Sequence, residues 1–117
     1  MNVELKKLIW VGTSLERVRE FPDEARQRVG RILRRIQQAL EPPDSKPIKV
    51  VGLGVAEVRI HVKGEYRVFY VVRFPEAIYV LHAFEKKSRK TRQADIEQGR
   101  RAYADLLRLR IIDWRVL

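Results

Sequence analysis

The sequence contains no cysteine, and this absence excludes three kinds of chemistry. Without thiols the chain cannot form disulfide bonds, build a thiolate zinc site or use a cysteine nucleophile. No segment approaches the roughly 18 apolar residues that a membrane-spanning helix needs. The first residues also lack the basic and apolar regions of a signal peptide. We therefore expect a cytoplasmic protein that does not contact a membrane.

The sequence also lacks the motifs of several large enzyme classes. There is no Walker A loop, no Gly-x-Gly-x-x-Gly fingerprint, no His-Glu-x-x-His and no nucleophile elbow. The string Gly52-Leu53-Gly54 has no third glycine and no following helix, so it predicts a bend. We accordingly expect neither a metal ion nor a cofactor.

Acidic residues are scarce relative to basic ones. The 117 residues include 25 Lys and Arg but 15 Asp and Glu, a net charge of +10. More than half of this excess lies within residues 46–90, which hold ten basic and four acidic side chains. A domain with such a surplus usually binds a polyanion. We therefore expect a single domain, residues 1–117, that binds RNA.

Two hydrophobic periods divide the chain. Apolar residues spaced by three and four predict helices, whereas strict alternation, clearest in residues 55–62, predicts half-buried strands. We place a strand at 8–11, helices at 15–20 and 22–41, strands at 55–62, 66–74 and 77–85, and a helix at 92–109. Ser14 is the expected N-cap of the first helix. The apolar tail 111–117 either continues the last helix or adds a strand.

Hairpin lengths predict which side chains share a face of the sheet. A three-residue loop at 63–65 pairs Val62 with Tyr66 and makes one face apolar, suited to cover by helices. A four-residue loop at 74–77 pairs Phe69 with His82 and places Arg73 opposite Ile78. The other face then carries Arg59, His61, Arg67, His82 and Phe84.

This face suits metal-independent cleavage of RNA. The RNA 2′-hydroxyl attacks the adjacent phosphate when a base removes its proton, an acid protonates the leaving oxygen, and cations stabilise the phosphoryl charge. Arg59 and Arg67 fit the cationic role, and His82 or His61 can transfer protons. Phe69, Tyr79 and Phe84 are candidates for stacking on bases. Further phosphate contacts are expected from Lys46, Lys49, Lys86, Lys87, Arg89 and Lys90.

The same residues fit a second interpretation. A basic sheet with aromatic side chains can hold RNA, or an acidic partner, without cleaving anything. The residues alone do not choose between cleavage and binding.

Six segments, in their order and spacing, resemble the phage-derived branch of the RelE/HigB toxin superfamily. They are residues 10–15 (WVGTSL), 21–26 (FPDEAR), 46–49 (KPIK), 58–60 (VRI), 66–70 (YRVFY) and 79–87 (YVLHAFEKK). The resemblance runs from about residue 8 to about residue 107. It implies an α+β fold of the RelE type, with two N-terminal helices packed on a mainly antiparallel twisted sheet, plus a C-terminal helix.

The resemblance also implies a function. The chain would be the toxin of a type II toxin–antitoxin pair and would cleave mRNA on the ribosome. Its partners would be the ribosome, mRNA and a helix-turn-helix antitoxin, which would also set the oligomeric state. Arg67 matches the family's catalytic arginine, and Arg59 and Lys87 match basic positions of the family. Some relatives instead poison DNA gyrase or carry a phage structural label, so a non-catalytic interaction protein of phage or operon origin is the alternative.

Overall fold

The computed structural model describes residues 4–116, and side chains within residues 4–111. Its elements are β1 (Leu8–Trp10), α1 (Ser14–Arg19), α2 (Asp23–Gln37), β2 (Ser45–Pro47), β3 (Val55–His61), β4 (Glu65–Val71), β5 (Ile78–Glu85) and α3 (Gln93–Val116). The five strands form one sheet in the order β1-β5-β4-β3-β2. β1 runs parallel to β5, and the other neighbouring strands are antiparallel. The expected α+β architecture is confirmed.

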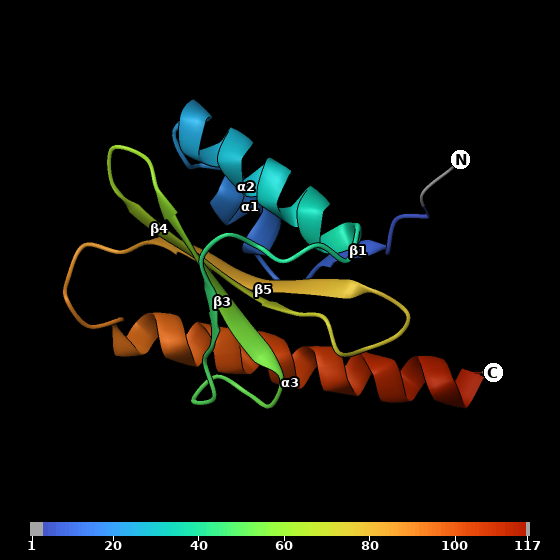
Figure 1. The fold of residues 1–117 in the computed structure, drawn as a ribbon. Coiled ribbons are helices and arrows are strands. Elements are labelled where there is room, and N and C mark those ends of the chain that lie inside the picture. The colour runs from blue at the N-terminus through green and yellow to red at the C-terminus, as the bar shows by residue number, and fades with distance from the viewer. Residues whose placement is uncertain (1–3, 117) are drawn as a thin grey trace.

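The sheet is the middle of three layers. Figure 1 shows α1 and α2 on one face and α3 on the other. Between α1, α2 and the sheet lies a core that includes Val29, Ile32 and Leu33 of α2 with Val58 and Val68 of the strands. The spacing of three and four in α2 therefore identified its buried face correctly.

The start of α1 and the end of α2 differ from the sequence prediction. Ser14 is not the N-cap of α1: it lies inside the helix, and its Oγ donates a hydrogen bond to the Val80 carbonyl oxygen at 3.0 Å. This buried bond ties α1 to β5. α2 ends at Gln37, before the prolines, because Ala39 takes a left-handed φ of 62°. Leu40 therefore leaves the apolar stripe and is 49% exposed.

The register of the β3–β4 hairpin differs from prediction by two residues. Tyr66 pairs with Ile60 instead of Val62, and His61 pairs with Glu65 across the loop. A shift of two keeps every side chain on its expected face, because strand side chains alternate with a period of two. The predicted faces are thus correct although the predicted partners are not.

A β-bulge separates the two halves of the β4–β5 ladder. Phe69 pairs with His82 and Arg67 with Phe84, as predicted, but Tyr70 pairs with Val80. Leu81 is the extra residue on β5. β4 ends at Val71, so the predicted pairing of Arg73 with Ile78 is wrong.

The second face of the sheet is largely covered by α3. Phe69, Tyr79 and Phe84 are buried there with Tyr103 and Leu106 of α3. Their predicted role as exposed stacking platforms is therefore wrong. The helix continues through Val116, which settles the tail in favour of helix, while Leu117 lies outside the described residues. Within residues 4–116, no helix combines the length and apolar character needed to cross a membrane.

Candidate nucleic-acid interface

A cleft of about 360 Å³ lies between the β2–β3 connection and the loop that leads into α3. Its floor is formed by Glu57, Arg59 and Arg67 on the α3-facing side of the sheet. The basic side chains that line it are Lys46, Lys49, Arg59, Arg67, Lys86 and Arg89. We call this hollow the cationic cleft. All six were predicted as RNA-contacting or catalytic residues, and the fold brings them to one place.

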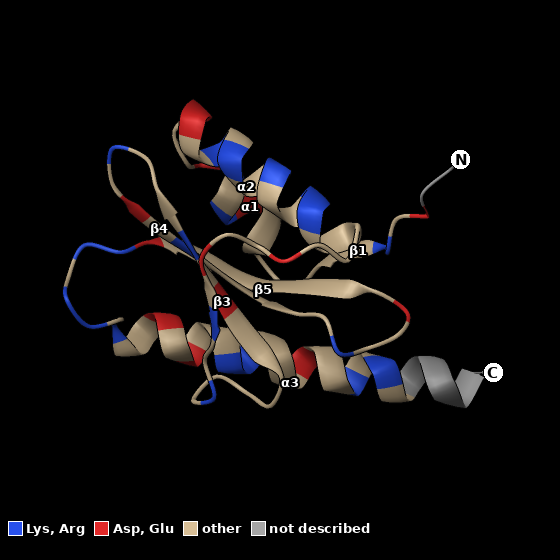
Figure 2. Cartoon of the chain, in the orientation of Figure 1, with Lys and Arg blue, Asp and Glu red and all other residues tan. Residues whose placement is uncertain are grey.

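The short strand β2, the turn after it and the loop after β5 position the lysines around the arginines of β3 and β4. Lys46 lies in β2 opposite Glu57 of β3, and Lys49 follows in the next turn. The loop after β5 starts at Lys86, whose backbone N–H donates to the Glu65 carbonyl oxygen at 2.7 Å and whose Nζ donates to the Arg89 carbonyl oxygen at 2.7 Å. Figure 2 shows that basic residues dominate this loop between β5 and α3.

Arg67 is the most buried cation of the cleft, with a side chain 8% exposed. Its Nη1 donates to Glu65 Oε2 and to the Tyr66 carbonyl oxygen, both at 3.3 Å. Its Nε is buried and has no hydrogen-bond acceptor. Arg67 also lies directly opposite Arg59 across the β3–β4 ladder. Like charges in this position repel each other, and a bound anion between them would relieve the repulsion.

Glu57 is the residue that the sequence reasoning missed. Its buried carboxylate accepts a hydrogen bond from Arg59 Nε at 3.4 Å, and the same Oε1 lies 3.7 Å from Arg67 Nε. Glu57 therefore bridges the two arginines while it lines the cleft. Strand alternation places Glu57 on the same face as Arg59, two residues along β3, and this spacing could have singled it out.

His61 lies outside the cleft but is connected to Arg67 through Glu65. Its Nδ1 lies 2.5 Å from Glu65 Oε2, and its Nε2 lies 3.0 Å from Asp44 Oδ2. The hydrogen bond to Glu65, and then that to Asp44, raises the pKa of His61 above its ordinary value. The His61 hydrogen bond in turn lowers the pKa of Glu65, with Arg67 adding to this effect. Protonated His61 thus helps to keep Glu65 ionised beside Arg67.

His82 is buried beneath α3 and does not line the cleft. Its Nε2 lies 2.8 Å from Asp95 Oδ1 in the first turn of α3, and the Asp95 Oδ2 accepts from Arg92 Nε at 3.3 Å. Burial lowers the pKa of His82, against the opposing effect of Asp95. Its Nδ1 is buried without a partner. A neutral imidazole that donates to Asp95 fits these contacts.

The remaining predicted site residues do not meet at the cleft. Lys87 lines a separate hollow beside α1, with Arg17 and Glu20. Lys90 is exposed in the loop, where its carbonyl oxygen accepts from Ser88 Oγ at 2.7 Å. None of the described residues that line the cationic cleft is aromatic. The cleft is therefore suited to phosphate contacts, which carry little sequence information, instead of base stacking.

Comparison with known proteins gives one family. A family model described as "Phage derived protein Gp49-like (DUF891)" matches residues 16–104. This range includes α2, the strands β2 to β5, and the basic side chains of the cationic cleft. No curated protein matches the chain. Because the family match spans most of the chain, the protein belongs to the phage-derived Gp49-like family.

Proposed function

We propose that this protein is a metal-independent, ribosome-dependent mRNA endoribonuclease and the toxin of a type II toxin–antitoxin pair. The observation that carries the proposal is the pair Arg59 and Arg67, facing each other in a cleft lined by four further cations. Guanidinium groups match phosphate oxygens in geometry and charge. The resemblance of the sequence to the RelE/HigB superfamily supplies the mRNA substrate and the ribosome.

The proposed cleavage needs a base, a proton donor for the leaving oxygen and a cationic site for the phosphate. Glu57 is the carboxylate that lines the cleft, and it accepts the proton of the 2′-hydroxyl. The 2′-oxygen then bonds to phosphorus while the bond from phosphorus to the 5′-oxygen breaks. The products are a 2′,3′-cyclic phosphate and a 5′-hydroxyl, whose proton comes from water or Lys86. Arg59 and Arg67 stabilise the charge on the phosphoryl oxygens.

We assign His82 a positioning role within this proposal. Its contact with Asp95 fixes the start of α3 on the sheet, next to the loop that carries Lys86 and Arg89. The loop can present its cations at a constant distance from Arg67 only if both of its ends are held. Neither His82 nor His61 lines the cleft, so in this proposal Glu57, which does line it, takes the proton.

Binding without cleavage is the second candidate function. One observation favours it: no imidazole lines the cleft among the described residues. In this interpretation the cations hold the phosphate backbone, and Glu57 only bridges the two arginines. A helix-turn-helix antitoxin remains the proposed protein partner in both cases, through the resemblance alone.

Mapping of mRNA 5′ ends on translating ribosomes separates these functions. Wild-type protein should create new 5′ ends, and Arg67→Lys, which keeps the charge but not the planar fork, should create at least tenfold fewer. Arg31→Lys, on the exposed side of α2, is the matched control and should match wild type. RNA binding without new 5′ ends would support the second candidate. DNA breaks with intact translation would support gyrase poisoning and contradict both.

A further inference from the structure

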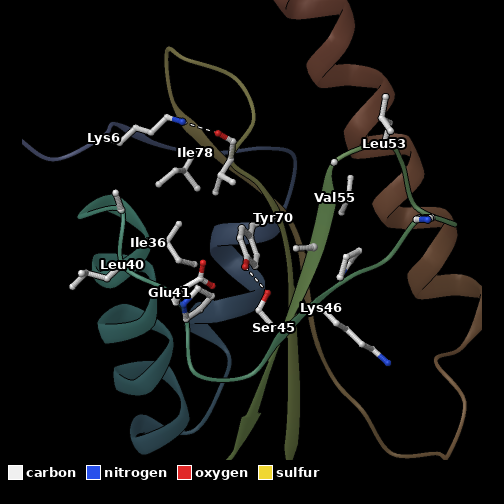
Figure 3. Close-up of a pocket in the computed structure, with 17 residues that line it drawn as sticks. Lys6, Ile36, Leu40, Glu41, Ser45, Lys46, Leu53, Val55, Tyr70 and Ile78 are labelled. Atoms are coloured by element: carbon white, nitrogen blue, oxygen red, sulfur yellow. Dashed lines mark hydrogen bonds between the residues drawn. The ribbon is translucent and has the colours of Figure 1, made fainter.

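An apolar groove of about 610 Å³ lies on the other side of β2 from the cationic cleft. It is bounded by the end of α2, the segment leading into β2, and the strands β3 and β4. Figure 3 shows Lys6 and Lys46 at its opposite ends, with apolar side chains between them and a hydrogen bond between Ser45 and Tyr70 on its floor. Apart from Lys46 and Lys49, which also line the cationic cleft, the residues of this groove take no part in the proposed RNA chemistry.

Exposed apolar side chains gather at this groove. Six large hydrophobic residues are exposed among those whose side chains the structure describes. Three of them line the groove: Leu40 at 49%, Leu53 at 75% and Val72 at 42% exposed. Val50, 52% exposed, lines the cationic cleft and not this groove. Exposed apolar side chains that line one hollow are typical of an interaction site. Leu53 is so exposed that covering it requires a partner extending beyond the hollow.

The charges around the groove are mostly positive and favour a partner with acidic residues. The lining includes Lys6, Lys46 and Lys49 but a single acidic residue, Glu41. Complementary charge across an interface speeds association and disfavours wrong partners. A segment with apolar residues along one side and acidic residues at its margins meets both features of the groove.

The groove and the cationic cleft share a wall. Lys46, Pro47 and Lys49 line both hollows. A segment whose carboxylates bind Lys46 and Lys49 would remove two of the six cations that face the cleft. Its acidic residues would also repel phosphates near the cleft entrance.

We propose that the groove binds an acidic amphipathic segment of a partner protein, and that this segment and RNA exclude each other. The mutual exclusion rests on the proposed RNA-binding function, whereas the binding of the segment does not. The groove is thus an inhibitory docking site built against the wall of the cleft.

Peptide display tests the groove without knowledge of the partner. A random library of 16-residue peptides is selected on the whole protein after depletion on the Leu40→Glu/Leu53→Glu variant. The enriched peptides should carry apolar and acidic residues in amphipathic spacing. Their affinity, measured by fluorescence anisotropy, should fall at least tenfold on Leu53→Ser and change less than twofold on Leu109→Ser. Leu109 is the matched control because it is exposed to 54%, on α3 and outside the groove.

A second measurement tests the exclusion. Addition of a selected peptide should displace a labelled single-stranded RNA from the wild-type protein, with the RNA affinity of Leu53→Ser unchanged. Enriched peptides that bind Leu53→Ser and Leu109→Ser equally, or that lack acidic residues, would overturn the docking site. Simultaneous binding of peptide and RNA would overturn the exclusion alone. Absence of RNA binding would contradict the proposed function and the exclusion while leaving the docking site to be judged by the peptide affinities.

Discussion

Arg59 and Arg67 lie opposite each other on neighbouring strands, and without the Glu57 carboxylate their positive charges would repel each other. Glu57 is buried, and one of its oxygens lies within 3.7 Å of both Nε atoms. Removing one partner of a buried charged group leaves the other partners uncompensated. The stability of this part of the sheet should therefore depend on the charge of residue 57.

Glu57→Gln tests this dependence. The change keeps the shape of the side chain but removes the negative charge, so the free energy of unfolding should fall by about 1–3 kcal/mol. Urea denaturation followed by circular dichroism measures it. Glu85→Gln, at the exposed end of β5, is the matched control and should change stability by less than about 0.5 kcal/mol. Equal stability of the two variants would show that Glu57 does not hold the arginines together.

The two histidines should respond to pH in opposite directions. Burial lowers the pKa of His82 below its ordinary value of 6.5, so its contribution to stability is present above pH 6.5 and lost as pH falls through the folded-state pKa. Contacts with Glu65 and Asp44 raise the pKa of His61, so its contribution is present below pH 6.5 and lost as pH rises through the folded-state pKa.

Urea denaturation between pH 5 and pH 8 measures both effects. His82→Gln should cost most stability at the alkaline end of this range and least at the acidic end. His61→Gln should show the reverse order. Parallel pH curves for the two variants would contradict the assigned environments, because a buried neutral imidazole and an ion-paired imidazolium cannot have the same pH dependence.

At the scale of the elements, two glycines inside helices occupy opposite environments. A Cβ at Gly30 of α2 would meet no atom within 4 Å, whereas a Cβ at Gly99 of α3 would lie 2.8 Å from Phe69 Cδ2. Phe69 is fully buried, so its ring cannot move aside. Gly99 is therefore a point of close contact between α3 and the sheet.

Alanine at each position tests the docking of α3. Gly30→Ala should raise the free energy of unfolding by about 0.5–1 kcal/mol, through helix propensity alone. Gly99→Ala should lower it by about 1–3 kcal/mol, because overpacking outweighs the same gain in propensity. Thermal and urea denaturation measure both changes. A stabilising Gly99→Ala would mean that α3 lies farther from β4 than described.

The buried faces of the elements were predictable from the sequence, but some of their ends were not. The buried face of α2 was predictable because period and burial are directly linked. Its end was not, because Ala39 adopts a left-handed φ that a non-glycine residue rarely takes. The register of the β3–β4 hairpin was wrong by two residues, because both registers bury the same apolar side chains.

On the scale of the whole molecule, the packing of α3 on the second face of the sheet determines which predicted site residues remain accessible. Alternation correctly placed Arg67, Phe69 and His82 on one face. It could not show how far α3 extends over that face, which buries His82 and leaves Arg67 at the cleft. The loop cations Lys86 and Lys87 are neighbours in sequence but line different hollows, a difference that only the tertiary structure determines.

The molecule carries a second basic surface, on α2, whose contribution to RNA binding can be compared with that of the cationic cleft. Arg31, Arg34 and Arg35 lie along the side of α2 away from the cleft. If net charge alone attracted RNA, both surfaces would contribute equally. The cleft instead combines cations from four segments around one hollow, so its phosphate contacts should dominate.

The most direct test is the affinity for a labelled single-stranded RNA, measured by fluorescence anisotropy at fixed salt, of two variants that each lose two positive charges. Lys46→Ala/Lys86→Ala removes cations from the cleft, and Arg31→Ala/Arg34→Ala removes them from α2. The proposed cleft predicts at least a tenfold loss of affinity for the first variant and less than a threefold loss for the second. Equal losses would show that RNA responds to the total charge and not to the cleft.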